Sequence, residues 1–129
     1  MFVYEKSPVY GNPVVEKSLE FSIRIVNLYK YLVRRDKSLF AIYNQVLRSG
    51  TSIGANISES QAASSLKDFT NKLAISLKES YETGYWLQIL YRSKILGEKE
   101  FESLNADNKE LIKLLISIIR TSKEKLNKL

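Results

Sequence analysis

The feature that most restricts the fold is the distribution of proline. The chain has two prolines, Pro8 and Pro13, and none from Val14 to its last residue, Leu129. Proline lacks a backbone N–H and its ring clashes with the preceding helical turn, so long helices exclude it from their interior. The proline-free part predicts an all-α domain over residues 14–129. Pro8 and Pro13 lie with Gly11 and Asn12, which predicts an extended N-terminal arm over residues 1–13.

Apolar residues recur at helical spacing in four segments. We expect helices over residues 14–35, 39–59, 65–96 and 107–125, with Asp36 or Ser38 capping the second and a Ser65–Asp68 pair capping the third. Gly97 is expected to end the third helix in a left-handed conformation, and residues 98–106 to form a connector with at most one short helical turn. Four helices with short links predict an up-down-up-down four-helix bundle. The expected core positions are Phe21, Ile25, Leu28, Leu32, Leu39, Ile42, Val46, Ile53, Ile57, Leu66, Phe69, Leu73, Leu77, Leu87, Tyr91, Leu111, Leu115, Ile118, Ile119 and Ser122.

Two residue types that carry much of enzyme and metal chemistry are missing. The chain has no Cys and no His, which removes thiolate nucleophiles and the commonest general base and metal ligand. We therefore expect no enzyme, no metal and no cofactor. There is no apolar run long enough to cross a membrane and no pattern typical of a signal peptide, so we expect a cytoplasmic protein without a membrane partner.

A run of small residues interrupts the second predicted helix. Gly50 and Gly54 lie one turn apart, with Ser49 and Ser52 beside them. A phosphate-binding P-loop would need a different glycine spacing and a following lysine, which the chain lacks. Since each glycine costs a helix up to about 1 kcal/mol, we expect that close packing of a neighbouring helix offsets this cost.

Charged and polar residues accompany this run. Glu79 and Glu82 lie three positions apart on the third predicted helix, and Glu59 ends the second. Di-metal carboxylate bundles also use histidine, so this set favours an ion pair with Arg48 or Lys78 that holds Asn56 in register, while an all-carboxylate Ca²⁺ or Mg²⁺ site stays an alternative.

Adjacent aromatic residues suggest a partner surface. Tyr85 and Trp86 point in different directions on a helix, so at most one belongs to the bundle core. The tyrosines and Trp86 are expected in the core or at subunit contacts, with stacking on RNA bases as the alternative. With Ile75 and Ile89, these residues exceed what one bundle face can bury, which predicts a homo-oligomer.

The net charge of +6 favours an anionic partner. Two basic stripes are expected on the outer helix faces, one on the first predicted helix and one, which includes Lys109, on the last. The candidate nucleic-acid-binding residues are Arg24, Lys30, Arg34, Arg35, Lys113, Arg120 and Lys123. A solvated charged face is the other explanation for such stripes.

Several stretches, in order along the chain, resemble a known family. They are residues 18–26, 47–59, Lys67-Asp68-Phe69, 78–83 and Trp86-Leu87. The chain is similar over Val14–Lys123 to the bacterial S23, or rRNA intervening-sequence, proteins. Its motif residues are Arg48, Ser49, Gly50, Ser52, Gly54, Asn56, Glu59, Glu79, Glu82 and Trp86.

The resemblance implies a four-helix bundle that assembles as a ring-like homopentamer, without an established biochemical activity. A related branch, the accessory variability proteins of retroelements, engages a reverse transcriptase and nucleic acid. The leading hypothesis is a non-enzymatic oligomer that binds structured RNA or a ribonucleoprotein through its basic outer faces. The alternative is a scaffold that recruits a protein partner, with nucleic acid incidental.

Overall fold

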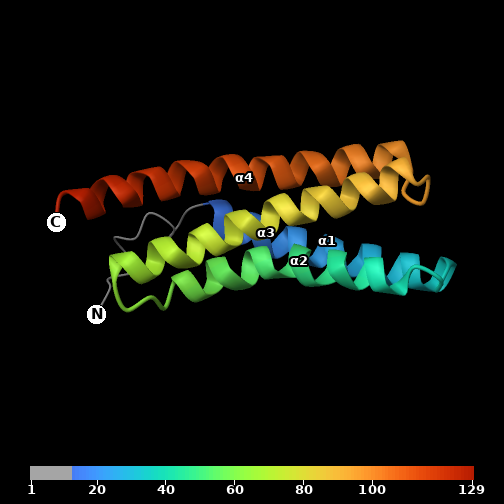
Figure 1. Ribbon diagram of the computed structural model, residues 1–129, viewed down its shortest axis with the longest axis horizontal. Coiled ribbons are helices and arrows are strands. Elements are labelled where there is room, and N and C mark those ends of the chain that lie inside the picture. The colour runs from blue at the N-terminus through green and yellow to red at the C-terminus, as the bar shows by residue number, and fades with distance from the viewer. Residues whose placement is uncertain (1–12) are drawn as a thin grey trace.

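The computed structural model describes residues 13–129, and within them the chain forms four helices and no strand. The helices are α1 (Pro13–Arg35), α2 (Phe40–Ser60), α3 (Leu66–Arg92) and α4 (Glu98–Asn127). The α1–α2 and α3–α4 turns lie at one end of the molecule and the α2–α3 connection at the other (Figure 1). The predicted N-terminal arm lies outside the described residues, except for Pro13. As the first residue of α1, Pro13 occupies a position that tolerates proline well.

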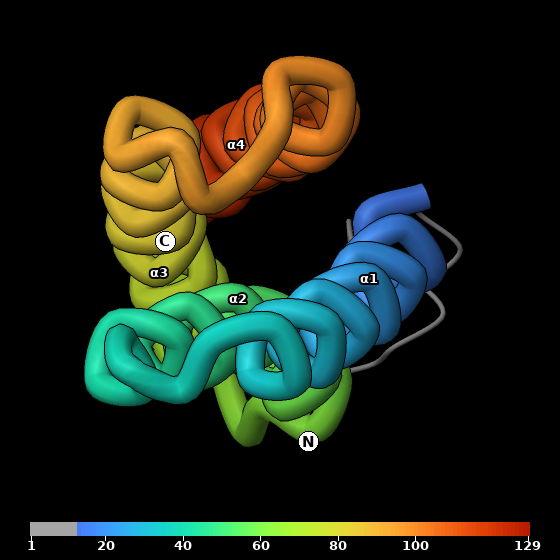
Figure 2. Tube along the Cα trace, turned by 90° about the vertical axis from the view of Figure 1, so that its right-hand side faces the viewer, coloured from blue at the N-terminus to red at the C-terminus, as the bar shows by residue number. Residues whose placement is uncertain are grey.

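The helices pack as a bundle around one apolar core. Contacts join α1 to α2, α2 to α3, α3 to α4 and, least extensively, α1 to α4. Seen from the end with the two turns, α1 and α3 lie on opposite sides, as do α2 and α4 (Figure 2). Of the expected core positions, Leu39, Ile42, Leu66, Leu77 and Tyr91 are partly buried against the core and all the others are buried.

The α3–α4 turn differs from the sequence prediction. Helix α3 ends at Arg92, and Lys94 takes the left-handed conformation, with φ of 62°, that was expected at Gly97. Gly97 is instead the extended residue that precedes α4. The predicted connector over residues 98–106 is wrong, because Phe101 and Leu104 are buried and continue the helical pattern of α4.

The predicted helix caps are confirmed in part. At α3, the Ser65 side chain accepts a hydrogen bond from the Asp68 N–H at 3.0 Å. The Asp68 carboxylate reaches the N–H of Ser64 rather than that of Ser65. At α2 the preceding residue is Leu39, which makes no side-chain cap. Asp36 instead accepts the Ser38 N–H within the turn, at 2.9 Å, and this bond lowers the pKa of the Asp36 carboxyl.

Polar side chains cross the seams between helices inside the bundle. Ser76 Oγ on α3 donates to the Ile53 carbonyl on α2 at 2.8 Å, and Thr83 Oγ1 donates to Ser49 Oγ at 3.0 Å. Asn108 Nδ2 on α4 donates to the Ser80 carbonyl on α3 at 3.0 Å. Because a buried polar group is costly without a partner, these bonds favour one register of α2, α3 and α4.

Candidate functional site

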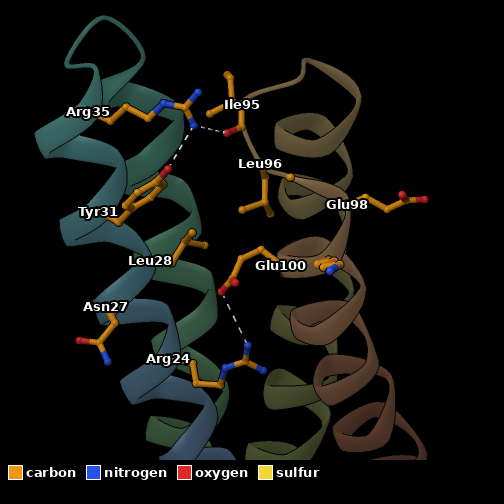
Figure 3. A pocket seen from close by; sticks show the side chains of 11 residues that line it. Arg24, Asn27, Leu28, Tyr31, Arg35, Ile95, Leu96, Glu98 and Glu100 are labelled. Atoms are coloured by element: carbon orange, nitrogen blue, oxygen red, sulfur yellow. Dashed lines mark hydrogen bonds and ion pairs between the residues drawn. The ribbon is translucent and has the colours of Figure 1, made fainter.

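A groove lies between α1 and α4, and we call it the α1–α4 groove. Its volume is about 810 Å³, and it is lined by the C-terminal half of α1, the end of the α3–α4 turn and the first turn of α4. Figure 3 shows Arg24, Leu28, Tyr31 and Arg35 along one wall, facing the segment from Ile95 to Glu100. No sequence pattern indicated this groove, because its walls come from segments about 60 to 80 positions apart.

Arg24 lies at one end of the groove and links α1 to α4. Its Nη1 lies 2.6 Å from Asp107 Oδ2, and its Nη2 donates to Ser103 Oγ at 3.0 Å. The Glu100 carboxylate lies 3.8 Å from the same guanidinium. Two acidic partners neutralise Arg24, so this residue does not belong to an outer basic stripe and acts as a link between helices.

Arg35 lies at the other end of the groove beside an exposed aromatic ring. Its Nη1 donates to the Ile95 carbonyl at 3.0 Å and contacts Tyr31 Oη at 3.4 Å. The guanidinium carbon is 6.0 Å from the centre of the Tyr31 ring, at the outer limit for a cation–π contact. Within residues 13–129 no carboxylate pairs with Arg35.

The other five predicted nucleic-acid contacts are exposed. They are Lys30, Arg34, Lys113, Arg120 and Lys123, and across the described helices none of the five forms an ion pair. Arg34 Nε donates to the Lys30 carbonyl at 3.3 Å, and this bond holds the Arg34 side chain along α1. Neither Lys30 nor Arg34 lines the α1–α4 groove. The structure therefore divides the seven candidates between the groove and the outer faces of two helices.

The motif carboxylates and Arg48 form the predicted ion pair between α2 and α3. Arg48 Nη1 lies 2.9 Å from Glu79 Oε2, and Nη2 contacts Glu82 Oε2. Glu82 also accepts the Trp86 Nε1–H at 3.0 Å. The bonds from Trp86 and Arg48 lower the pKa of Glu82, and the Glu82 partner raises the pKa of Arg48.

Asn56 takes no part in this network. Its Nδ2 donates to the Ser52 carbonyl on its own helix at 2.8 Å, so the prediction that the ion pair holds Asn56 in register is wrong. Glu59 pairs separately with Lys72 on α3, at 3.1 Å. The ion pairs of Arg48 and Glu59, but not Asn56, join α2 to α3. Among residues 13–129 no three acidic side chains gather as a metal site would require.

The small-residue run packs against α1, as predicted. A Cβ added to Gly50 would lie 2.8 Å from Ile25 Cγ1, and one added to Gly54 would lie 3.0 Å from Ser22 Oγ and 3.1 Å from the Ser18 carbonyl. The hydroxyls of Ser49 and Ser52 donate hydrogen bonds to backbone carbonyls one turn earlier in α2. The two glycines thus let α1 and α2 approach closely.

The neighbouring aromatic residues separate as expected. Trp86 packs against the core, and Tyr85 is 61% exposed. The two rings meet edge to face with centroids 5.2 Å apart. The other exposed apolar residues on α1 and α3 are Leu19, Ile23, Val26, Tyr31, Ile75 and Tyr81, and Phe40 at the start of α2 and the terminal Leu129 are also exposed.

These features define a helical bundle whose motif residues build the seams between its helices. None of the helices described for residues 13–129 combines the length and apolarity that crossing a membrane requires. The chain belongs to the 23S rRNA-intervening sequence protein family, whose model matches residues 11–117. The family predicted from the motifs is confirmed.

A solved relative is similar over most of the chain. It is a protein of unknown function from the S23 ribosomal protein family of Bacteroides thetaiotaomicron. The two share 56% sequence identity and a TM-score of 0.82, over 84% of this chain and 96% of the relative. No curated protein matches the chain.

Proposed function

We propose that this protein is a non-enzymatic, cytoplasmic oligomer that binds structured RNA, alone or in a ribonucleoprotein, through exposed basic residues of α1 and α4. The name of its family refers to an intervening sequence of 23S rRNA, which makes ribosomal RNA the first candidate ligand. The contacts would be Lys30 and Arg34 on α1 and Lys113, Arg120 and Lys123 on α4. Arg24 is left out because carboxylates already neutralise it.

The distribution of ion pairs carries this proposal. Residues 13–129 contain 19 Lys and Arg, of which four form ion pairs, leaving 15. They contain 13 Asp and Glu, of which six are paired, leaving seven. The ion pairs between helices thus involve more carboxylates than cations. The side chains outside these ion pairs are therefore more positive in sum than the net charge of the chain indicates. A positive surface of this kind attracts the phosphate backbone of nucleic acids.

Self-association into a ring of five up-down-up-down bundles is the second part of the proposal. Ile75 and Tyr85 are 45% and 61% exposed, and α1 carries Leu19, Ile23 and Val26 on its surface. Exposed apolar side chains that lie along one helix, such as these three on α1, are typical of protein interfaces. A ring would also repeat each basic residue in every subunit and so strengthen binding to a long RNA.

The experiment compares two double variants that lose the same charge. Lys113→Ala/Arg120→Ala removes cations without acidic partners, and Lys17→Ala/Lys72→Ala removes cations that pair with Glu110 and Glu59. Affinity for a fluorescent rRNA hairpin is measured by anisotropy from 50 to 300 mM salt. For the first variant we expect weaker binding and a salt slope smaller in magnitude by about 0.7 to 0.9 for each phosphate that is no longer neutralised. For the second we expect a slope close to that of the wild type.

Equal and shallow slopes for all three proteins would overturn RNA binding. That result would favour the alternative, a scaffold for a protein partner, which the exposed Tyr81 and Tyr85 support. The scaffold predicts that partner capture is abolished in Tyr81→Ala/Tyr85→Ala and unchanged in Lys113→Ala/Arg120→Ala.

A further inference from the structure

We propose that the α1–α4 groove binds one unpaired nucleotide of the RNA, with its base against Tyr31 and its phosphate at Arg35. This inference rests on the proposed function and adds to it the kind of RNA that the protein prefers. The outer basic residues attract any RNA, whereas the groove would select RNA with a base free to leave the helix.

The size and lining of the groove suit a flat organic ligand. Its volume of about 810 Å³ falls in the range of roughly 300 to 1,000 Å³ that is typical of small-molecule sites. Leu28 and Leu96 form an apolar floor and are only 6% and 4% exposed. Such sites combine apolar walls with a few polar groups that fix orientation. Here those groups are Arg35 and Lys99.

Tyr31 offers an aromatic ring that is only half buried. It lines the groove and is 52% exposed, whereas Tyr43 on α2 is buried in the core. Proteins recognise unpaired RNA bases by stacking them on aromatic rings and on arginine planes. Tyr31 and Arg35 provide both surfaces within one turn of α1.

Arg35 offers a positive charge at a fixed place. The Ile95 carbonyl and Tyr31 Oη hold its Nη1, and within the described residues Nη2 and Nε keep their N–H groups without a hydrogen-bond partner. The two nearby acids do not oppose this charge, since Glu100 lies against Arg24 and the Glu98 side chain points away from α1 (Figure 3). Lys99, on the wall that faces Arg35, adds a second cation. A phosphate at the mouth of the groove could therefore accept hydrogen bonds from the Arg35 N–H groups that no side chain of the described residues uses.

The experiment uses the full chain and two RNAs with the same stem. One is a blunt duplex, and the other carries a single bulged 2-aminopurine. We expect the wild type to bind the bulged RNA at least about five-fold more tightly, since stacking one base on an aromatic side chain contributes this much or more. Binding should also quench the 2-aminopurine fluorescence, because the base stacks on Tyr31.

A matched tyrosine provides the control. Tyr31→Ala should bind the duplex and the bulged RNA equally, with the affinity that the wild type has for the duplex, and should not quench the 2-aminopurine. Tyr31→Phe should restore the preference for the bulged RNA and the quenching. Tyr81→Ala removes a ring of similar exposure, 56%, from outside the groove and should behave as the wild type. Free adenosine monophosphate should bind far more weakly than the bulged RNA, because it lacks the contacts of the stem.

The outcomes separate the two proposals. If duplex and bulged RNA bind equally and Tyr31→Ala changes neither affinity nor quenching, the groove proposal is overturned and RNA binding stands. If adenosine monophosphate binds as tightly as the bulged RNA, the ligand is a free nucleotide and the groove proposal is likewise overturned. If neither RNA binds, both proposals fail.

Discussion

Arg24 and Asp107 lie 83 positions apart in the sequence, and their side chains meet at 2.6 Å between the first and the last helix. Lys17 and Glu110 pair further along the same two helices, at 3.1 Å. Since α1 and α4 make the least extensive contact of the neighbouring helices, these ion pairs add polar links where the packing between helices is smallest.

The first prediction concerns this attachment. A double-mutant cycle of Arg24→Ala and Asp107→Ala should give a favourable coupling of up to about 1 kcal/mol, as for other partly exposed pairs. The coupling should shrink in 1 M salt, where the Debye length falls to about 3 Å. Urea denaturation of the four proteins measures the free energy of unfolding at each salt concentration. A coupling near zero at low salt would show that the pair does not stabilise the bundle.

The second prediction concerns the close approach of α1 and α2. Gly54→Leu should destabilise the protein by about 1 to 3 kcal/mol or more, because the added side chain meets the Ser18 backbone. Ala55→Leu is the control, since it adds a similar side chain at the next, exposed position and should change stability by less than about 0.5 kcal/mol. Thermal unfolding followed by circular dichroism distinguishes them, and equal melting temperatures would contradict the observed packing.

The third prediction concerns pH. Since bonds from Trp86 and Arg48 lower the pKa of Glu82 below its ordinary value of 4.5, the folded state binds this proton less readily than the unfolded state. Glu82 therefore contributes stability that is fully present above pH 4.5 and is lost as the pH falls through the lower, folded pKa. In Glu82→Gln, the free energy of unfolding should therefore depend less on pH in this range. The contribution of Asp36, whose pKa is also lowered, should remain.

The tryptophan provides a direct readout of the same group. Trp86 is the chain's one tryptophan and donates to Glu82, so its fluorescence should titrate with a midpoint below 4.5 in the wild type. This step should disappear in Glu82→Gln. A midpoint at or above 4.5 would contradict the pKa direction.

The fourth prediction concerns assembly. Light scattering at micromolar concentration should give about five times the chain mass of 14.9 kDa. Tyr85→Glu or Ile75→Glu should reduce this mass, because each places a charge on an exposed apolar surface. Lys113→Glu, at an exposed polar position, should leave it unchanged. A monomer in the wild type would end the proposal of a ring.

The periodic parts of the fold could be predicted from the sequence. Phe21, Ile25, Leu28 and Leu32 repeat at helical spacing, and all four are buried. The ion pair of Arg48 was predictable because its helix and that of Glu79 are consecutive in the chain, which makes them neighbours.

Features that depend on tertiary structure could not be predicted. Residues 98–106 follow a glycine and resemble a connector, but they form the first turns of α4, where Phe101 stacks on Tyr91 of α3 with ring centroids 4.3 Å apart. The turn uses Lys94 in a left-handed conformation that glycine usually adopts, so no sequence pattern marked it. The groove and the partners of Arg24 depend on how α1 faces α4, which helical periodicity does not specify.

The unequal seams of this bundle also have an evolutionary consequence. Where α1 meets α2, the glycines leave no space for a larger side chain, so substitutions there must be compensated on the facing helix at the same time. Where α1 meets α4, long charged side chains span the groove and can be exchanged one by one. Variation among homologues should therefore accumulate along the α1–α4 seam, and new ligand preferences can arise there without loss of the fold.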